Sequence, residues 1–93
     1  MTVLSCGFLT WTEAKNLEDD EFRLPEIHEL YKLSEMGFLN KTDYYWSNTS
    51  SKNDSNWKKS LTFNNCKGNY PRELIGYKLK ITAKTILIKR NEN

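Results

Sequence analysis

The chain has little of what a metal or redox site requires. His28 is its one histidine, and its two cysteines, Cys6 and Cys66, lie sixty residues apart with no CxxC pair or Cys/His cluster. A zinc site built from protein side chains alone, or any other cofactor site, is therefore not expected. Without an export signal, the two thiols are expected to be free rather than paired.

Long apolar runs are missing as well. No window approaches the roughly 18 apolar residues that a membrane-spanning helix needs. The first nine residues lack a basic start, and their apolar run is too short for a signal peptide. We therefore expect no membrane association and a cytoplasmic protein, in the host cytoplasm if its source is viral.

What is present is enough for one small core. The 93 residues predict a single domain, 1–93, and the 38% of hydrophobic residues include three Trp, five Tyr and four Phe. Aromatic side chains bury large areas, so they offset the low aliphatic content.

Charge is divided unevenly along the chain. Residues 1–46 hold four basic and nine acidic residues, a net of −5, whereas residues 47–93 hold ten basic and three acidic residues, a net of +7. Such asymmetry can mark a surface that binds nucleic acid or another polyanion. The alternative is that acidic helices lie against basic strands and the charges cancel.

The residue pattern predicts two early helices followed by strands, which is an α+β fold. A strand is expected over 3–9, then a short helix over 13–17 capped by Thr10 or Thr12. A second helix begins at Pro25, carries an apolar stripe and ends at Gly37. Strands are predicted over 44–46, 57–63, 77–81 and 85–90, with a long exposed loop over 47–56, a turn over 64–69 and no clear assignment for 70–76.

Five motifs occur in an order that matches a known family. They are Thr10-Trp11-Thr12-Glu13-Ala14, then the segment from Phe22-Arg23-Leu24-Pro25 to Glu29-Leu30, Tyr45-Trp46-Ser47-Asn48-Thr49, the segment from Asn56-Trp57 to Phe63, and Ile86-Leu87-Ile88-Lys89-Arg90. In these motifs the chain resembles the DUF1566 group, also called the Lcl C-terminal domain group. The resemblance implies a compact, small C-type-lectin-like domain, with two early helices packed on a mainly antiparallel sheet.

Departures from that family pattern qualify the functional expectation. The cysteines that family members often carry in the first helix and the last strand are missing, which argues against the extracellular setting typical of the family. The Glu-Pro-Asn and Trp-Asn-Asp calcium motifs of sugar-binding lectins are missing too. The resemblance therefore implies a scaffold and not sugar binding.

Residues that suggest chemistry have structural explanations. Glu26 and Glu29 flank His28, but carboxylates in a first helical turn favour the helix dipole, and His28 is expected to be exposed. Cys66 has no visible base beside it. Arg23 is expected to anchor a loop by bonding backbone carbonyls. We therefore expect no enzymatic activity.

The expected function is binding. The predicted binding residues are the aromatic, polar and basic side chains of the later half, namely Trp46, Asn48, Asn53, Trp57, Tyr70, Arg72, Lys78 and Lys80. For Trp46 and Trp57 the alternative is a place in the core. The favoured partner is an intracellular protein, as for a phage- or mobile-element-encoded inhibitor of a host factor. The alternatives are a nucleic-acid or polyanion binder that uses the basic half, and a surface carbohydrate- or receptor-binding module.

Overall fold

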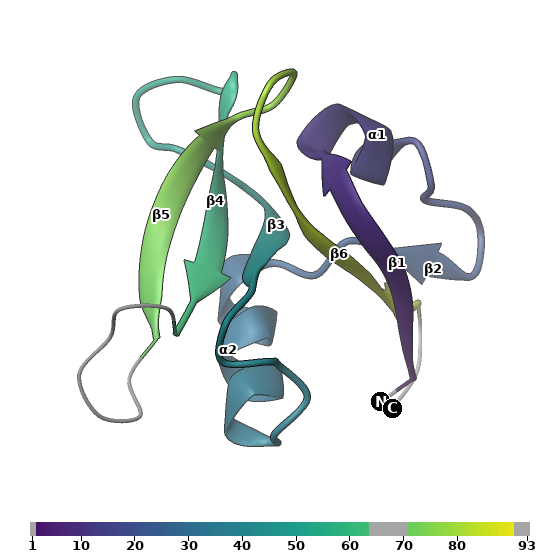
Figure 1. The fold of residues 1–93 in the computed structure, drawn as a ribbon. Coiled ribbons are helices and arrows are strands. Elements are labelled where there is room, and N and C mark those ends of the chain that lie inside the picture. Colours follow the sequence, from purple (N-terminus) through teal and green to yellow (C-terminus); the bar gives the residue numbers. More distant parts are fainter. Residues whose placement is uncertain (1, 64–70, 91–93) are drawn as a thin grey trace.

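A computed structural model describes residues 2–63 and 71–90. Within them the chain forms two helices and a six-stranded sheet, which confirms the α+β class (Figure 1). In chain order the elements are β1 (Val3–Thr10), α1 (Trp11–Lys15), β2 (Phe22–Arg23), α2 (Ile27–Glu35), β3 (Tyr44–Ser50), β4 (Trp57–Thr62), β5 (Arg72–Tyr77) and β6 (Thr82–Lys89).

The sheet is mainly antiparallel, as predicted. Its strand order is β1-β6-β3-β4-β5, and β2 also pairs with β6. The one parallel pair joins β3 to β6 at Tyr45 and Lys84. In Figure 1 this contact joins β1, β2 and β6 on the right to β3, β4 and β5 on the left. The start of β1 lies beside the end of β6, where Val3 pairs with Ile88.

Each face of the sheet carries its own apolar cluster, because side chains alternate along a strand. On one face α2 contributes Leu30 and Leu33, which pack with Tyr45, Leu61, Ile86 and Ile88. On the other face Ala14 of α1 packs with Leu24, Trp46, Ala83 and Leu87. The two helices therefore cover opposite faces.

Local sequence explains both helix boundaries. Thr10 caps α1, since its hydroxyl accepts the Glu13 N–H and the Glu13 carboxylate accepts the Thr10 N–H. Helix α2 begins at Ile27 instead of Pro25, because Glu26 is still extended and serves as the N-cap. It ends at Glu35 with Met36 as C-cap, and the predicted Gly37 follows with a φ of 80°, the left-handed conformation that favours glycine after a helix.

Three strand predictions are corrected by the structure. Strand β3 continues to Ser50, which pairs with Lys58, so the loop is only 51–56. Residues 72–76, for which the sequence predicts no clear structure, form β5 together with Tyr77. The expected strand over 77–81 is wrong, because Tyr77 ends the ladder and its carbonyl accepts the N–H groups of Lys80 and Ile81 in a turn. The predicted turn over 64–69 lies outside the described residues.

Candidate functional site

The Arg-Leu-Pro-Glu segment forms a hydrogen-bonded junction inside the protein. The Arg23 guanidinium makes a two-pronged bond to the Glu29 carboxylate, with N···O distances of 2.7 and 2.8 Å, and also donates to the Leu24 carbonyl. This bond lowers the pKa of Glu29 and raises that of Arg23. Because Glu29 also accepts the Glu26 N–H, this carboxylate holds the start of α2. The backbone-anchoring role predicted for Arg23 is thus present, with an ion pair added.

The Ser-Asn-Thr end of β3 completes the junction. Glu26 accepts hydrogen bonds from the Thr49 hydroxyl at 2.8 Å and the Asn48 amide at 2.9 Å. The amide oxygen of Asn48 accepts from the Lys15 ammonium at 3.0 Å. The Thr49 hydroxyl in turn accepts the Ile27 N–H at 3.0 Å. These bonds tie α1, α2 and β3 together, so both carboxylates beside His28 serve the fold, and His28 itself is exposed as expected.

Two tryptophans fasten β1 and α1 to β3. The Trp46 indole N–H donates to the Leu9 carbonyl at 2.8 Å, and the Trp11 indole N–H donates to the Ser47 carbonyl at 2.9 Å. The prediction that Trp46 contacts a partner is wrong, because its side chain is 0% exposed; it belongs to the core. Asn48 is likewise committed at both ends of its amide to bonds inside the protein.

Lys58 is the most unusual of the basic residues. It is only 8% exposed, and its ammonium lies 4.1 Å from the centroid of the Trp11 ring and 2.7 Å from the Ser50 hydroxyl. Burial lowers its pKa, and the nearby charges of Lys78 and Lys15 lower it further. Positive charge therefore gathers where α1, β4 and the end of β5 meet.

The remaining predicted binding residues that the structure describes lie at or near one margin of the sheet. Trp57, at the start of β4, is 38% exposed, so the core alternative is wrong for this residue. Arg72 and Lys80 are exposed at the two ends of β5, and Lys78 is half-buried. Asn53 is exposed in the β3–β4 loop, and Tyr70 lies outside the described residues.

The structure adds three residues that the sequence reading missed. Ile75, Leu79 and Ile81 are large apolar side chains with 49–56% of their surface exposed. Ile75 is on β5, and the other two are in the turn that follows it. Together with Trp57, Tyr77, Lys78 and Lys80 they lie along the β5 edge and the turn that follows it, on both faces of the sheet, and we call these residues the β5 margin. Their exposure has a signal in the sequence, since Lys78 to Ile81 alternate basic and apolar residues. The same alternation also predicts a strand, which is the structure expected for this segment.

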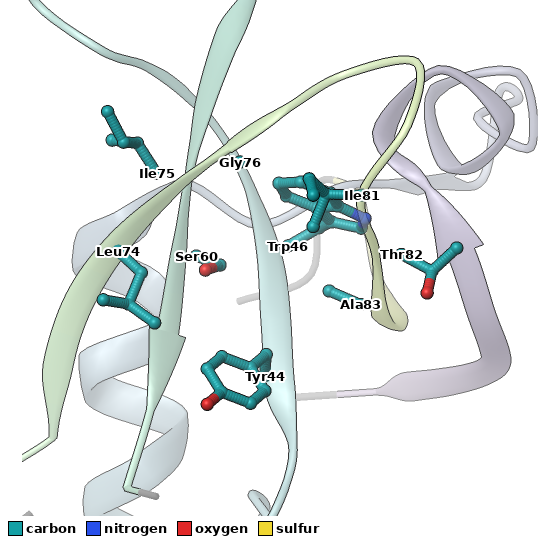
Figure 2. Close-up of a pocket in the computed structure, with 9 residues that line it drawn as sticks. All are labelled: Tyr44, Trp46, Ser60, Leu74, Ile75, Gly76, Ile81, Thr82 and Ala83. Carbon is teal, nitrogen blue, oxygen red and sulfur yellow. The ribbon is translucent and has the colours of Figure 1, made fainter. Parts of the chain in front are cut away.

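A hollow of about 200 Å³ lies in the β5 margin (Figure 2). It is mostly apolar, and its lining comes from β3, β4, β5 and the start of β6. Ile81 lies over the buried Trp46 ring, and Leu74 and Tyr44 stand on the other sides. Beside the hollow, the absence of a side chain at Gly76 lets the Trp46 ring pack directly against the backbone of β5, since a Cβ there would lie 2.7 Å from Trp46.

The basic half is partly neutralised by acidic residues, but not by acidic helices lying against basic strands, because Glu18 and Asp43 lie outside the helices and Glu73 belongs to the basic half. Lys84 lies 3.6 Å from Asp43, and Arg90 lies 3.8 Å from Glu18. Lys59 on β4 pairs with Glu73 on β5 at 3.0 Å.

Residues that could serve catalysis or metal binding are scattered. Within residues 2–63 and 71–90, no group of three or more His, Cys, Asp or Glu side chains is placed to hold a metal ion. Burial raises the pKa of the Cys6 thiol, which favours its unreactive neutral form. In the same part of the chain, no helix has the length and apolar content that crossing a membrane requires.

Comparisons with known proteins gave no relatives. No protein-family model matches the chain, and neither the curated proteins nor the solved structures include a significant match.

Proposed function

We propose that this chain is a non-enzymatic binding domain that docks onto another protein through the β5 margin. The observation that carries the proposal is the joint exposure of Trp57, Ile75, Leu79 and Ile81 at one end of the sheet. Large apolar side chains gathered on a surface mark interaction sites, and aromatic anchors dominate the binding energy at such sites. The basic residues Lys78 and Lys80 would form the polar rim.

The proposal of a non-enzymatic role is supported by what the carboxylates do. Glu26, Glu29 and Glu73, which are the acidic residues nearest to the sequence motifs and the margin, all accept hydrogen bonds from inside the protein. Their oxygens are occupied in holding α2 and β5. A general acid or base needs an atom that faces the substrate and can give up or accept a proton.

We propose further that the fold is a small C-type-lectin-like domain. The five motifs shared with the DUF1566 group support this. The pairing of the first strand with the last also supports it, since both helices lie between these strands in the chain. In such a scaffold the binding surface is set by local side chains and not by the fold. Inhibition of a host factor, the use expected from the sequence, would require a protein-docking surface of this kind.

Affinity capture from extracts of the source cells tests the proposal. The wild-type protein is compared with an Ile75→Glu/Leu79→Glu variant and with a Phe8→Glu control, which alters a 62% exposed side chain on β1 at the far edge of the sheet. We expect one protein to be retained in stoichiometric amount by the wild type and the control, and to be lost from the double variant. Melting curves establish that all three are folded.

Two results would overturn the proposal. One is a captured protein that the double variant retains and the control loses. The other is salt-sensitive retention of DNA, RNA or heparin by the wild type without any captured protein, which would favour the polyanion alternative.

A further inference from the structure

The sheet has two edges, and they differ in regularity. Along β1 the pairing with β6 shifts register between Ser5 and Gly7, which is a bulge. Along β5 the pairing with β4 runs without a shift from Arg72 opposite Thr62 to Tyr77 opposite Trp57. Bulges twist an edge and prevent another strand from adding to it, so β1 is protected and β5 is not.

The centre of β5 also lacks the chemical protection common on edge strands. Natural edges are blunted by charged side chains and proline. Leu74, Ile75, Gly76 and Tyr77 contain neither. The one acidic residue of the strand, Glu73, is exposed, but its carboxylate pairs with Lys59 and accepts the Tyr31 hydroxyl. The outward backbone N–H and C=O groups of this segment therefore lie beside an uncharged surface.

Both faces of the β5 edge offer contacts to an added strand. Residues directly opposite on neighbouring strands lie within about 5 Å, so side chains of an added strand would lie beside those of β5. On one face they would meet Leu74 and Gly76 and the hollow above Trp46 (Figure 2). On the other face they would meet Ile75 and Tyr77, whose ring packs edge-on against Trp57 at 5.6 Å. Helix α2 covers only the lower part of that face (Figure 1).

Charge indicates which kind of strand fits. Lys78 and Lys80 follow β5 directly, and among the described residues their ammonium groups form no ion pair. Lys58 adds a third charge close to Lys78. An acidic segment gains from this concentration of positive charge, whereas a second copy of the chain would bring the same lysines toward it.

We propose that an extended acidic segment of the partner protein adds to β5 as a further antiparallel or parallel strand, with one apolar side chain seated in the hollow. The inference rests on the proposed function and specifies its chemistry. A dry apolar cavity of about 150 Å³ can hold benzene, so a hollow of about 200 Å³ accommodates one phenyl or isobutyl group. The backbone ladder would supply affinity, and the hollow and the lysines would supply selectivity.

The test uses random heptapeptides displayed on yeast. Peptides are selected on the wild-type protein and counter-selected on an Ile81→Glu variant, in which a carboxylate stands over the hollow. We expect enrichment of peptides that alternate apolar residues with Asp or Glu. Binding of the synthetic peptides should weaken at least tenfold in a Lys78→Glu/Lys80→Glu variant and remain unchanged in a Lys32→Glu control, whose exposed lysine lies on α2.

Backbone pairing has its own signature. Two N-methylated forms of the best peptide are compared, one blocked at odd and one at even positions, because a strand pairs through alternate residues only. We expect one form to lose binding and the other to keep it, and β5 amides to gain protection from hydrogen exchange.

Failure of this inference is separable from failure of the proposed function. Strand addition is overturned if no peptide survives counter-selection, or if both N-methylated forms bind as well as the parent peptide. The proposed function would still stand if the Ile75→Glu/Leu79→Glu variant loses the captured protein.

Discussion

Replacing Gly76 by alanine should destabilise the protein although a strand interior ordinarily favours alanine. A Cβ built at Gly76 lies 2.7 Å from Cη2 and 3.3 Å from Cζ3 of Trp46, and 3.2 Å from Cγ2 of Ile81. Ile81 is half-exposed and can shift, but Trp46 is buried and fixed by its bond to the Leu9 carbonyl. The clash must therefore be relieved by movement of the strand or the indole.

The magnitude follows from two opposing effects. Alanine stabilises a strand interior by about 0.5–1 kcal/mol relative to glycine. Overpacking of a well-packed core costs about 1–3 kcal/mol. The cost here belongs at the upper end of that range, because the Trp46 ring is buried and its indole N–H is bonded to the Leu9 carbonyl. We expect a net loss of about 2–2.5 kcal/mol in the free energy of unfolding. For a domain of this size each kcal/mol lowers the melting temperature by about 4–8 °C.

The assay is urea unfolding followed by circular dichroism, carried out in two backgrounds. In a Trp46→Phe background the two outer indole carbons are gone, so Gly76→Ala should become neutral or stabilising. Gly7→Ala is the control, because Gly7 has φ +83° with no atom near its Cβ. Its cost is backbone strain, because a residue with a Cβ rarely adopts a positive φ, and this strain does not depend on the size of the ring at Trp46. A Gly76→Ala variant as stable as the wild type, or equally destabilised in both backgrounds, would refute the crowding argument.

Three further changes test single interactions. Glu29→Gln should lower the melting temperature at pH 7 and make it depend less on pH in the acid range. The pKa of Glu29 is lowered in the folded protein, so its ionised form stabilises the fold at pH values above the ordinary pKa of 4.5, and this stabilisation is lost as the pH falls. An unchanged acid profile would contradict the prediction. Thr85→Val should stabilise the fold by about 1 kcal/mol in urea unfolding, because the Thr85 hydroxyl is fully buried and has no hydrogen-bond partner among the described residues; a less stable variant would contradict this. Tyr31→Phe should remove a late component from the ultraviolet phenolate titration, because burial and then the bond to Glu73 raise the pKa of Tyr31 to about 12. The stability of this variant should also fall less between pH 10 and 12 than that of the wild type. A titration identical to that of the wild type would contradict the prediction.

Elements with local signals could be predicted from the sequence. The capping threonine and acidic residue of α1 act within one turn, and so does the glycine that ends α2. The alternation of β4 and the apolar run of β6 also identify these strands. In each case the residues that decide the structure are near neighbours in the chain, so the pattern is visible without knowledge of the fold.

Elements that depend on distant partners could not be predicted. The two residues of β2 form a strand only because Phe22 pairs with Lys89 and Arg23 with Ile88. Residues 78–80 alternate like a strand, but β4 begins at Trp57 and offers no partner beyond Tyr77. The Lys78 carbonyl instead accepts hydrogen bonds from the backbone and hydroxyl of Thr12. Contacts over sixty or more residues override the local pattern in both places.

The candidate site was located in part. Trp57, Lys78 and Lys80 were predicted and lie in the β5 margin, whereas Trp46 and Asn48 were predicted and serve the interior. The presence of a tryptophan or an asparagine in the sequence does not distinguish a residue of an interface from a residue of the core. Only the side of the strand that each residue faces, and the partner across it, decide between the two roles.

The motif residues hold the fold together, whereas the proposed binding residues lie elsewhere, on the surface. The most specific sequence pattern therefore says least about function. The Arg-Leu-Pro-Glu and Trp-Ser-Asn-Thr segments are specific because each polar group in them has a defined internal partner, such as Arg23 on Glu29 and Asn48 on Glu26. A group that is satisfied internally would have to break that bond in order to bind a ligand, at a cost of about 1–3 kcal/mol. Leu79 and Lys80 carry no such cost, because their side chains are already exposed and the turn that holds them is fixed by its backbone. Binding is therefore expected where the sequence pattern is ordinary and the edge of the sheet is unpaired.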